Sequence, residues 1–319
     1  MDPIVDLSVI FVSYNTLEMT KKALSDLFAS VHNFKMKVYV VDNDSKDHSA
    51  EILRRECSNI TLIENVTNVG FGRANNQALP YLDSRYVLLL NTDAFVALDA
   101  ISKTIDYMDK NSKCGILGVK LLGRNGELQP SCRYFPTPWN IFLSRTGFYR
   151  FVKHIKMVDD MSWDHNSVRD CDWVPGCYYL IRKEVIDQVG LFDPRYFLYY
   201  EEIDHCFAAK AAGWKVTYFP FTSVVHIGGE SAKSEGEITK SGRQIEALKI
   251  ESEMLYFQKN YGVIGTLENL LLNSLTDFIL TIKDVLRFKP LKVILSHFRR
   301  SMYMWMIFFR TKFATIPTR

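Results

Sequence analysis

The stretch VYVVDNDS at residues 38–45 contains the pattern that sets the fold class. Its first half is apolar and β-branched, which favours a buried strand, and it ends in acids, an amide and a hydroxyl. The same pattern recurs at LSVIFVSYN (residues 7–15) and at YVLLLNTD (residues 86–93). Helical patterns separate these strands, and such alternation with short connections indicates a sheet of parallel strands covered on both faces. We therefore predict an α/β fold with a Rossmann-like, mostly parallel central sheet.

Polar side chains follow each of these three strands. Ligands of such sheets bind beyond the carboxyl ends of the strands, so the candidate binding residues are Ser13, Asn15, Asp42, Asn43, Asn91 and Asp93. A carboxylate at Asp42 can accept the N3–H of uracil or thymine, or it can cap a helix. Asp93 can supply an oxygen ligand to a divalent cation, or it can form a turn.

The segment NVGFGRANN at residues 68–76 contains a glycine-bearing turn that leads into a helix, which we expect over Ala74–Leu82. Exposed backbone N–H groups at a helix start suit a phosphate or a ribose. The glycines also fit a tight loop with no ligand. The candidates here are Asn68, Gly70, Gly72 and Asn76.

The second half of the chain contains FDPRYFLYYEEID at residues 192–204, where Glu201 and Glu202 follow an aromatic run. Crowded, partly desolvated carboxylates have raised pKa values and can act as general bases. Acids at a helix start also stabilise the helix through its dipole. His226 precedes two glycines, and neutral imidazole is a good ligand for Mn²⁺, although a lone histidine is more often structural. We also expect a strand over Trp173–Ile181 and a long helix over Ile238–Tyr261.

Composition excludes a disordered, collagenous or coiled-coil chain, because 47% of the 319 residues are hydrophobic and 24% are charged. The longest run without a charged side chain, residues 216–229, is shorter than the roughly 20 residues that cross a bilayer. The first residues lack the basic segment of a signal peptide. The six cysteines form no CxxC pair, so we expect free thiols in a reducing cytoplasm.

The net charge of +3 is unevenly distributed. Residues 263–319 contain nine Lys and Arg against three Asp and Glu, a net +6, which leaves −3 for residues 1–262. Apolar residues recur at helical spacing over 271–286 and 293–309, among basic side chains. Basic amphipathic helices with Trp and Phe bind anionic membrane surfaces; packing on the rest of the chain and an oligomer contact are the alternatives. Nucleic acid is not an expected partner, because no nucleic-acid-binding fold accompanies the charge.

Taken in order, these motifs resemble the inverting glycosyltransferases of family 2, which have the GT-A fold. The resemblance is greatest to rhamnosyltransferase-like enzymes of bacterial surface polysaccharide synthesis and covers about residues 6–262. It rests on the segments 12–15, 41–45, 68–76, 90–93, 173–176, 192–204 and 226–229. It implies a GT-A catalytic domain at residues 1–262 and an amphipathic helical extension at residues 263–319.

The resemblance also implies roles for single residues. Asp42 would recognise the base, with Ser13 and Asn15 near the nucleoside, and Trp173 and Gly176 would border the donor sugar and the acceptor. Asp93 and His226 would hold Mg²⁺ or Mn²⁺ and the diphosphate. Glu202 would be the catalytic base.

This sequence departs from the family pattern at two positions. Asn91 replaces the first acid of the metal motif, and Glu202 stands where aspartate is usual, so Glu201 is a second candidate for the base. The Gln-x-x-Arg-Trp motif of processive members is absent, which favours transfer of one sugar at a time.

The expected activity is metal-dependent transfer from dTDP-rhamnose or a UDP-sugar to a lipid-linked saccharide. The enzyme would act in O-antigen (lipopolysaccharide), capsule or exopolysaccharide synthesis, in the cytoplasm at the inner face of the cell membrane. A sugar-phosphate nucleotidyltransferase is one alternative, but it would need a glycine-rich basic loop after the first strand. A non-catalytic sugar- or partner-binding module is the other, and the presence of Asp93, Glu202 and His226 argues against it.

Overall fold

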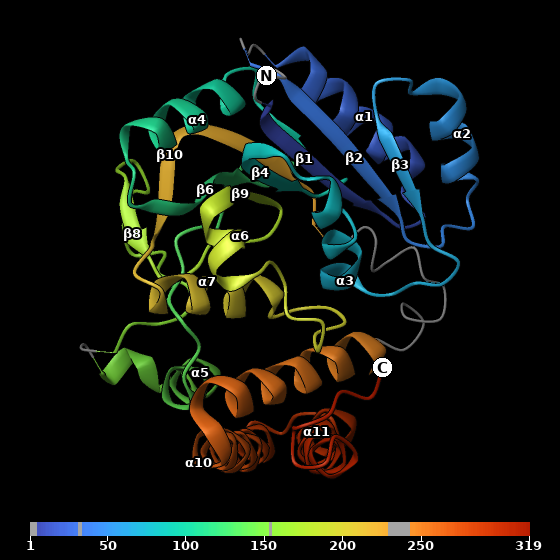
Figure 1. Ribbon diagram of the computed structural model, residues 1–319. Helices are drawn as coiled ribbons and strands as arrows, with labels where there is room; N and C mark the ends of the chain where they lie inside the picture. The colour runs from blue at the N-terminus through green and yellow to red at the C-terminus, as the bar shows by residue number, and fades with distance from the viewer. Residues whose placement is uncertain (1–4, 31–33, 153–154, 229–242) are drawn as a thin grey trace. The chain divides into compact units, whose positions relative to one another are not determined.

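The computed structural model describes residues 5–30, 34–152, 155–228 and 243–319, which form two compact units (Figure 1). The first unit comprises residues 1–133, 161–197 and 201–242, and the second comprises residues 134–160, 198–200 and 243–319. This division differs from the boundary expected at residue 262. That position lies inside a long helix, and two earlier segments of the chain join the helical unit.

The first unit is built on a ten-stranded sheet in the order β3-β2-β1-β4-β9-β6-β10-β5, with β7 paired to β6 and β8 paired to β10. The strands are β1 (Val5–Ser13), β2 (Met36–Asp42), β3 (Thr61–Glu64), β4 (Ser84–Leu90), β5 (Ala94–Val96), β6 (Cys114–Leu122), β7 (Leu128–Gln129), β8 (Arg169–Cys171), β9 (Tyr178–Arg182) and β10 (Lys215–His226).

The strand directions make this sheet mixed rather than mostly parallel. Strands β3, β2, β1 and β4 are parallel, as are β6 and β10, but β9 runs antiparallel to both of its neighbours, β4 and β6. The stretch expected as one strand over Trp173–Ile181 is a loop followed by β9, which begins only at Tyr178. Within that loop, Trp173 pairs with Arg133 in an isolated antiparallel bridge.

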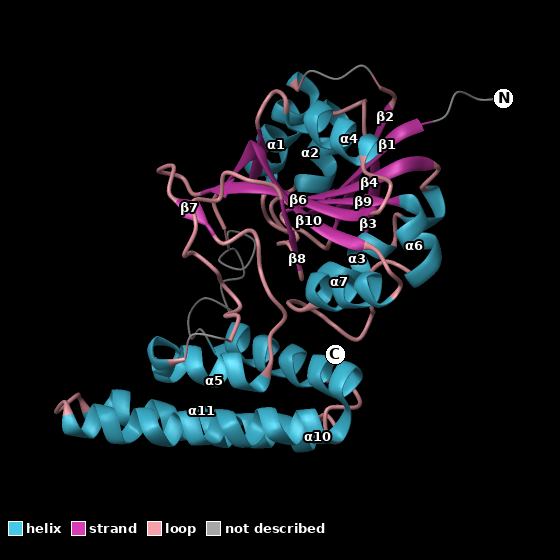
Figure 2. Ribbon diagram, turned by 90° about the vertical axis from the view of Figure 1, so that its left-hand side faces the viewer, coloured by secondary structure: helices cyan, strands magenta, loops and turns pink. Residues whose placement is uncertain are grey.

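Helices cover both faces of the sheet, because its central strands are apolar on both sides. They are α1 (Leu17–Ala29), α2 (Ser49–Glu56), α3 (Phe71–Asn76), α4 (Ala100–Lys110), α6 (Lys183–Val189) and α7 (Glu201–Ala211). Figure 2 shows α1, α2 and α4 on one face and α3, α6 and α7 on the other. The helix expected over Ala74–Leu82 is instead α3 followed by a 3₁₀ turn, Leu79–Tyr81, which begins next to Pro80.

The second unit is helical. It contains α5 (Pro138–Thr146), a 3₁₀ turn (Phe148–Phe151), α10 (Arg243–Leu286) and α11 (Leu291–Arg310). Gly262, with φ of 68°, kinks α10. Helices α10 and α11 pack on each other around a small apolar core of Ile250, Met254, Leu270, Met304, Ile307, Phe308 and Ala314. The first residues of the helix expected over Ile238–Tyr261 lie outside the described residues.

Candidate active site

Asp42 ends β2 with its side chain only 3% exposed. Its Oδ1 accepts the backbone N–H of Ser45 at 3.0 Å, whereas its buried Oδ2 has no hydrogen-bond partner among the described residues. Burial raises the pKa of this carboxyl. A buried acceptor without a hydrogen bond raises the free energy of the folded protein. The arrangement therefore suits a ligand that donates a hydrogen bond to Oδ2, such as the N3–H of a pyrimidine ring.

The glycine-bearing segment connects the end of β2 to the acidic helix α7. The Asn43 side chain donates to Asn68 Oδ1 at 2.9 Å and accepts the N–H of Val69 at 3.0 Å. Gly70, with φ of 87°, lies so close to Phe197 that a Cβ would be 2.3 Å from the Phe197 carbonyl oxygen. Only glycine fits at this point, and the turn therefore fixes the chain that leads into α7.

Asp93 and His226 lie together where β5 pairs with β10. His226 Nε2 is 3.6 Å from Asp93 Oδ1, and Asp93 is 5% exposed. Gln129 donates through its amide nitrogen to the His226 carbonyl at 2.9 Å, so its Oε1 accepts a hydrogen bond from His226 Nδ1–H at 3.0 Å. That hydrogen bond leaves the Nε2 lone pair directed at the carboxylate.

Two acceptors that face each other in this way need a cation or a proton between them. A carboxylate oxygen and an imidazole nitrogen fit Mg²⁺ or Mn²⁺, and a second hydrogen bond that orients the histidine is typical of metal sites. Among the described residues no group of three His, Cys, Asp or Glu could hold a metal ion. A metal here would therefore complete its coordination with ligand oxygens and water, as Mg²⁺ commonly does.

Glu201 and Glu202 begin α7 and have different surroundings. Glu201 is 1% exposed, its Oε1 has no partner among the described residues, and its Cγ lies 3.1 Å from where a Cβ on Gly72 would be. Burial and the charge of Glu202 raise the Glu201 pKa well above its ordinary value. Glu202 is half-buried and borders Gly176, which leaves space beside its carboxylate.

Burial also raises the pKa of Glu202, and the positive charge of Arg133 opposes that shift. The Arg133 guanidinium lies 4.1 Å from the ring centre of Trp173, and the backbones of the two residues are hydrogen-bonded. Trp173 is itself buried. Trp173 therefore packs against the Arg133 cation, which interacts with the candidate base. Because this region is partly removed from water, the attraction between the two charges is strong.

The structure brings Asp93 and Glu202 to the same part of the sheet. The buried thiol of Cys177, just before β9, has its pKa raised by burial and by the charges of both carboxylates. The Cys177 carbonyl accepts the N–H of Asn91, the half-buried residue after β4. Thr16 and Thr92, in the loops that follow β1 and β4, are hydrogen-bonded at 3.1 Å, which joins these two loops.

Several residues expected to bind the donor are engaged inside the chain instead of pointing to an open site. The Ser13 hydroxyl contacts Thr20 at 3.1 Å, and the Asn76 amide makes two hydrogen bonds with the backbone of Phe192. Asn15, with φ of 52°, accepts the N–H of Lys46. A role in donor binding stays a prediction for these residues; what the structure gives them is a role in holding the surrounding loops.

Gln129 and Arg133 are site residues that the sequence reasoning missed. Gln129 ends the short strand β7 and Arg133 lies in the loop after it, and both are far along the chain from His226 and Glu202. No local motif marks them, because their importance comes only from the pairing of β7 with β6 and of Arg133 with Trp173.

Comparison with known proteins finds related sequences and solved structures that resemble this chain. The chain is 25% identical over 238 residues to an N-acetylglucosaminyl-diphospho-decaprenol L-rhamnosyltransferase of Mycobacterium tuberculosis, covering 69% of this chain and 75% of that one. It is 26% identical over 238 residues to the rhamnosyltransferase WbbL of Escherichia coli, covering 71% and 85%.

A mannosyltransferase of Pyrobaculum calidifontis, solved in complex with GDP-Man and Mn²⁺, shares the fold with a TM-score of 0.57 and 14% identity, over 98% of this chain and 89% of that one. The fold is thus the predicted GT-A type with a helical C-terminal region. The model of glycosyl transferase family 2 matches residues 8–168, half of the chain. The protein belongs to the family 2 glycosyltransferases.

Proposed function

We propose that this enzyme transfers one sugar, with inversion, from a nucleotide-sugar donor to a hydroxyl group of a lipid-linked saccharide. The observation that carries the proposal is that Glu202 borders Gly176, while the carbonyl of the next residue, Cys177, accepts the N–H of Asn91, two residues before Asp93. One carboxylate has an imidazole partner suited to a metal, and the other has a raised pKa suited to a base.

In the proposed reaction Glu202 accepts the proton of the acceptor hydroxyl as its oxygen attacks the anomeric carbon. The bond to the nucleoside diphosphate breaks on the opposite face, and the diphosphate leaves with the bonding electron pair. A positioned base contributes about 10²- to 10⁴-fold to the rate. Asp93 and His226 would hold Mg²⁺ or Mn²⁺, which neutralises charge on the diphosphate. The unpartnered Oδ2 of Asp42 supports a uracil or thymine nucleotide.

Glu202 is preferred to Glu201 as the base because of their environments. Glu201 is packed against α3, and burial together with the charge of Glu202 raises its pKa well above the ordinary value, which makes it the poorer proton acceptor. Glu202 has space beside Gly176 and a cation, Arg133, that favours its ionised form.

L-rhamnose from dTDP-rhamnose is the proposed donor sugar, since two relatives are rhamnosyltransferases. The acceptor proposed from the Mycobacterium relative is an N-acetylglucosaminyl-diphospho-polyprenol. UDP-glucose is the second donor to be compared in the assay, because two other relatives are a hexosyltransferase and a glucosyltransferase.

The test is transfer from each donor to this acceptor with Mg²⁺, Mn²⁺ or EDTA, followed by mass spectrometry of the product. Glu202→Gln should abolish transfer while donor binding is kept, and Glu184→Gln, on the exposed side of α6, is the matched control. Normal transfer by Glu202→Gln, or transfer in EDTA equal to that in Mn²⁺, would contradict the corresponding assignment.

We further propose that the helical unit binds the inner surface of the cell membrane. Helix α10 is long and apolar enough to cross a bilayer by length and composition, with 39% of the apolar window buried. Its buried side packs on α11, and its other side forms an exposed apolar face together with α11. The members of this face are Ile264, Leu267, Leu271, Leu275, Phe278, Ile282, Leu286, Leu291, Leu295, Phe298, Met302, Met306 and Phe309.

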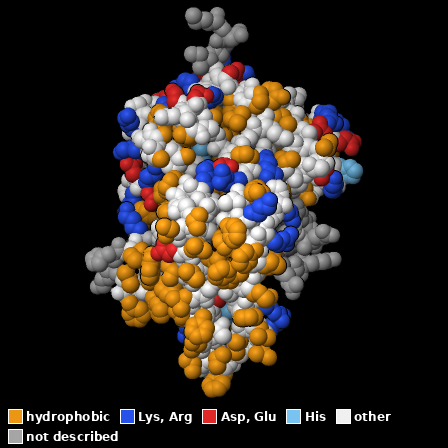
Figure 3. All heavy atoms as spheres, turned by 60° about the horizontal axis from the view of Figure 1, so that its bottom comes forward, with side chains coloured by type: hydrophobic (Ala, Val, Ile, Leu, Met, Phe, Trp, Pro, Cys, Tyr) orange, Lys and Arg blue, Asp and Glu red, His pale blue; other side chains and the backbone are white. Residues whose placement is uncertain are grey.

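Figure 3 shows hydrophobic side chains gathered over these helices. The same part of the chain has exposed cations at Arg287, Lys289, Lys292, Arg299, Arg310, Lys312 and Arg319, whereas none of the three acids in residues 263–319 is exposed. One apolar face flanked by cations is the pattern of a helix that lies in the membrane surface. An apolar face of this extent is unusual on a soluble monomer.

Flotation with vesicles of anionic and of zwitterionic lipid tests this proposal. The double variant Phe278→Glu and Phe298→Glu should lose binding to anionic vesicles, and Phe221→Glu, an exposed residue of the first unit, is the control. If the double variant floats like the wild type, the membrane proposal is refuted. If the wild type self-associates through this face and does not float, an oligomer contact replaces it.

A further inference from the structure

The three residues before the acidic pair belong to the other compact unit. Leu198–Tyr200 are part of the helical unit, although the chain on both sides, up to Phe197 and from Glu201 onward, belongs to the sheet unit. The start of α7 therefore follows directly from a segment that the helical unit holds. Glu202, the proposed base, is two residues beyond Tyr200.

The backbone of this segment needs outside support. Tyr199 and Tyr200 have φ of 73° and 72°, in the left-handed region that residues with a side chain seldom adopt. Two such residues in succession do not keep this conformation by local preference. Residues held in this region persist where surrounding contacts over-determine them, and such positions cluster at active sites.

Helix α10 supplies a contact to each residue of the segment. The hydroxyl of Ser252, which is buried, donates to the Leu198 carbonyl at 2.9 Å. The Lys249 ammonium lies 4.8 Å from the ring centre of Tyr199. The Tyr200 hydroxyl donates to Glu253 Oε2 at 3.3 Å.

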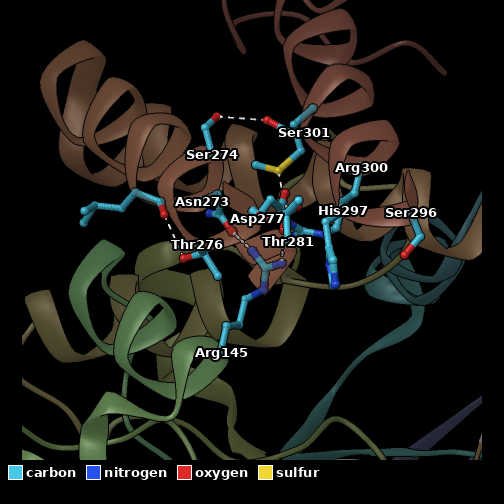
Figure 4. A network of polar contacts seen from close by, with 12 residues as sticks. Arg145, Asn273, Ser274, Thr276, Asp277, Thr281, Ser296, His297, Arg300 and Ser301 are labelled. Carbon is cyan, nitrogen blue, oxygen red and sulfur yellow. Dashed lines mark hydrogen bonds and ion pairs between the residues drawn. The ribbon is translucent and has the colours of Figure 1, made fainter. Parts of the chain in front are cut away.

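Glu253 is itself fixed from the far side of the kink in α10. Its Oε1 accepts from the amides of Asn269 at 2.8 Å and Asn273 at 3.2 Å. Asn273 in turn accepts from Arg145 on α5 at 2.6 Å, as part of the polar network in Figure 4. The contact that holds Tyr200 is thus anchored to α5 and to both halves of α10.

We propose that Ser252 and Glu253 are positioning residues, which hold Leu198–Tyr200 in its left-handed conformation and thereby set the place of the Glu202 carboxylate. This inference rests on the proposed role of Glu202 as base. A displacement of about 1 Å in a reacting group costs up to about 100-fold in rate. Loss of either contact therefore lowers kcat without removing any group that touches the donor.

The test compares Ser252→Ala and Glu253→Gln with two matched controls on the same helix. Glu251→Gln changes the nearby acid that contacts Thr318, and Ser274→Ala changes a hydroxyl on the second half of α10. We expect kcat to fall about 10- to 100-fold in the two test variants with an unchanged donor KM, and to stay at the wild-type value in the controls. Ser252→Thr keeps the hydroxyl and should restore kcat.

Two further readouts separate positioning from general loss of structure. The acidic limb of the kcat/KM pH profile should move to lower pH in the test variants, because a displaced carboxylate is better solvated and its pKa falls. Hydrogen exchange of the peptide that spans residues 198–204 should be faster in the test variants, with the melting temperature of the protein unchanged.

The outcomes distinguish this inference from the function on which it rests. If Glu202→Gln is inactive but Ser252→Ala and Glu253→Gln match the controls in kcat and hydrogen exchange, the positioning role is overturned and the proposed base stands. If Glu202→Gln keeps full turnover, the proposed base is wrong. A test variant could also lower the melting temperature. If its hydrogen exchange is then no faster in residues 198–204 than elsewhere in the chain, the positioning role is overturned.

Discussion

Replacement of Glu201 by glutamine should make the enzyme more stable at neutral pH, and increasingly so as the pH rises. Glu201 is almost fully buried, and its Oε1 lacks a partner among the described residues. Its pKa in the folded protein is well above the ordinary value of 4.5 because of burial and the charge of Glu202. Glutamine has nearly the same shape as the protonated acid and cannot ionise.

The magnitude follows from proton linkage. Above pH 4.5 the unfolded chain releases the Glu201 proton, whereas the folded protein keeps it until its higher pKa is reached. The folded state then binds more protons, so the free energy of unfolding falls by about 1.4 kcal/mol for each pH unit in this window. Below pH 4.5 the group is protonated in both states and contributes no pH dependence. Glu201→Gln removes the decrease in the free energy of unfolding above pH 4.5, because glutamine does not ionise.

Urea unfolding of the metal-free protein measures the effect. The free energy of unfolding of Glu201→Gln minus that of the wild type should increase by about 1.4 kcal/mol per pH unit above pH 4.5, until the raised folded pKa is reached. Glu184→Gln, on the exposed side of α6, is the matched control for removal of one carboxylate. If the difference in free energy of unfolding between Glu201→Gln and the wild type does not change with pH, Glu201 is ionised in the folded protein. The reasoning that made Glu202 the base would then fail.

Three other changes test separate parts of the structure. Asp42→Asn should weaken binding of dTDP or UDP about tenfold by calorimetry, because its unpartnered oxygen can no longer act as a charged acceptor; equal affinity would remove it from base recognition. Asp277→Ala should destabilise the helical unit by about 3–5 kcal/mol, since two arginines lose their buried partner, whereas Asp26→Ala, in an exposed pair, should cost below about 1 kcal/mol; similar melting temperatures would contradict this. Gly70→Ala places a Cβ 2.3 Å from the Phe197 carbonyl and should lower both the melting temperature and kcat; wild-type values would show that the turn adapts.

The sequence predicted the part of the fold in which local pattern and tertiary structure agree. Apolar runs that end in polar residues at Ser13, Asp42 and Asn91 are strands β1, β2 and β4, and their polar ends meet as expected for neighbouring parallel strands. The direction of β9 was not predictable in the same way. An apolar run has the same composition in either direction, and only the loop through Gly176 lets the chain enter the sheet antiparallel.

Residue types predicted some contacts correctly and others not. A carboxylate and a histidine far apart in the chain were expected to share a metal, and Asp93 and His226 do lie 3.6 Å apart. The amides of Asn43 and Asn76 were assigned to the donor for the same kind of reason, yet their hydrogen bonds are made within the chain. An amide side chain fits a ligand and a neighbouring loop equally well, so its type alone cannot decide between them.

The boundary of the helical unit also depends on contacts that no local pattern reveals. Residues 263–319 were separated by their charge, but the structure extends the unit back through Gly262 to α10's first half, where Ser252 and Glu253 hold the segment before Glu201. The apolar face proposed for the membrane lies on the second half of the same helix. Because Asn269 and Asn273 bind Glu253 across the kink, the two halves are tied together. The contacts that α10 makes with Leu198–Tyr200 therefore depend on residues from both halves of this helix.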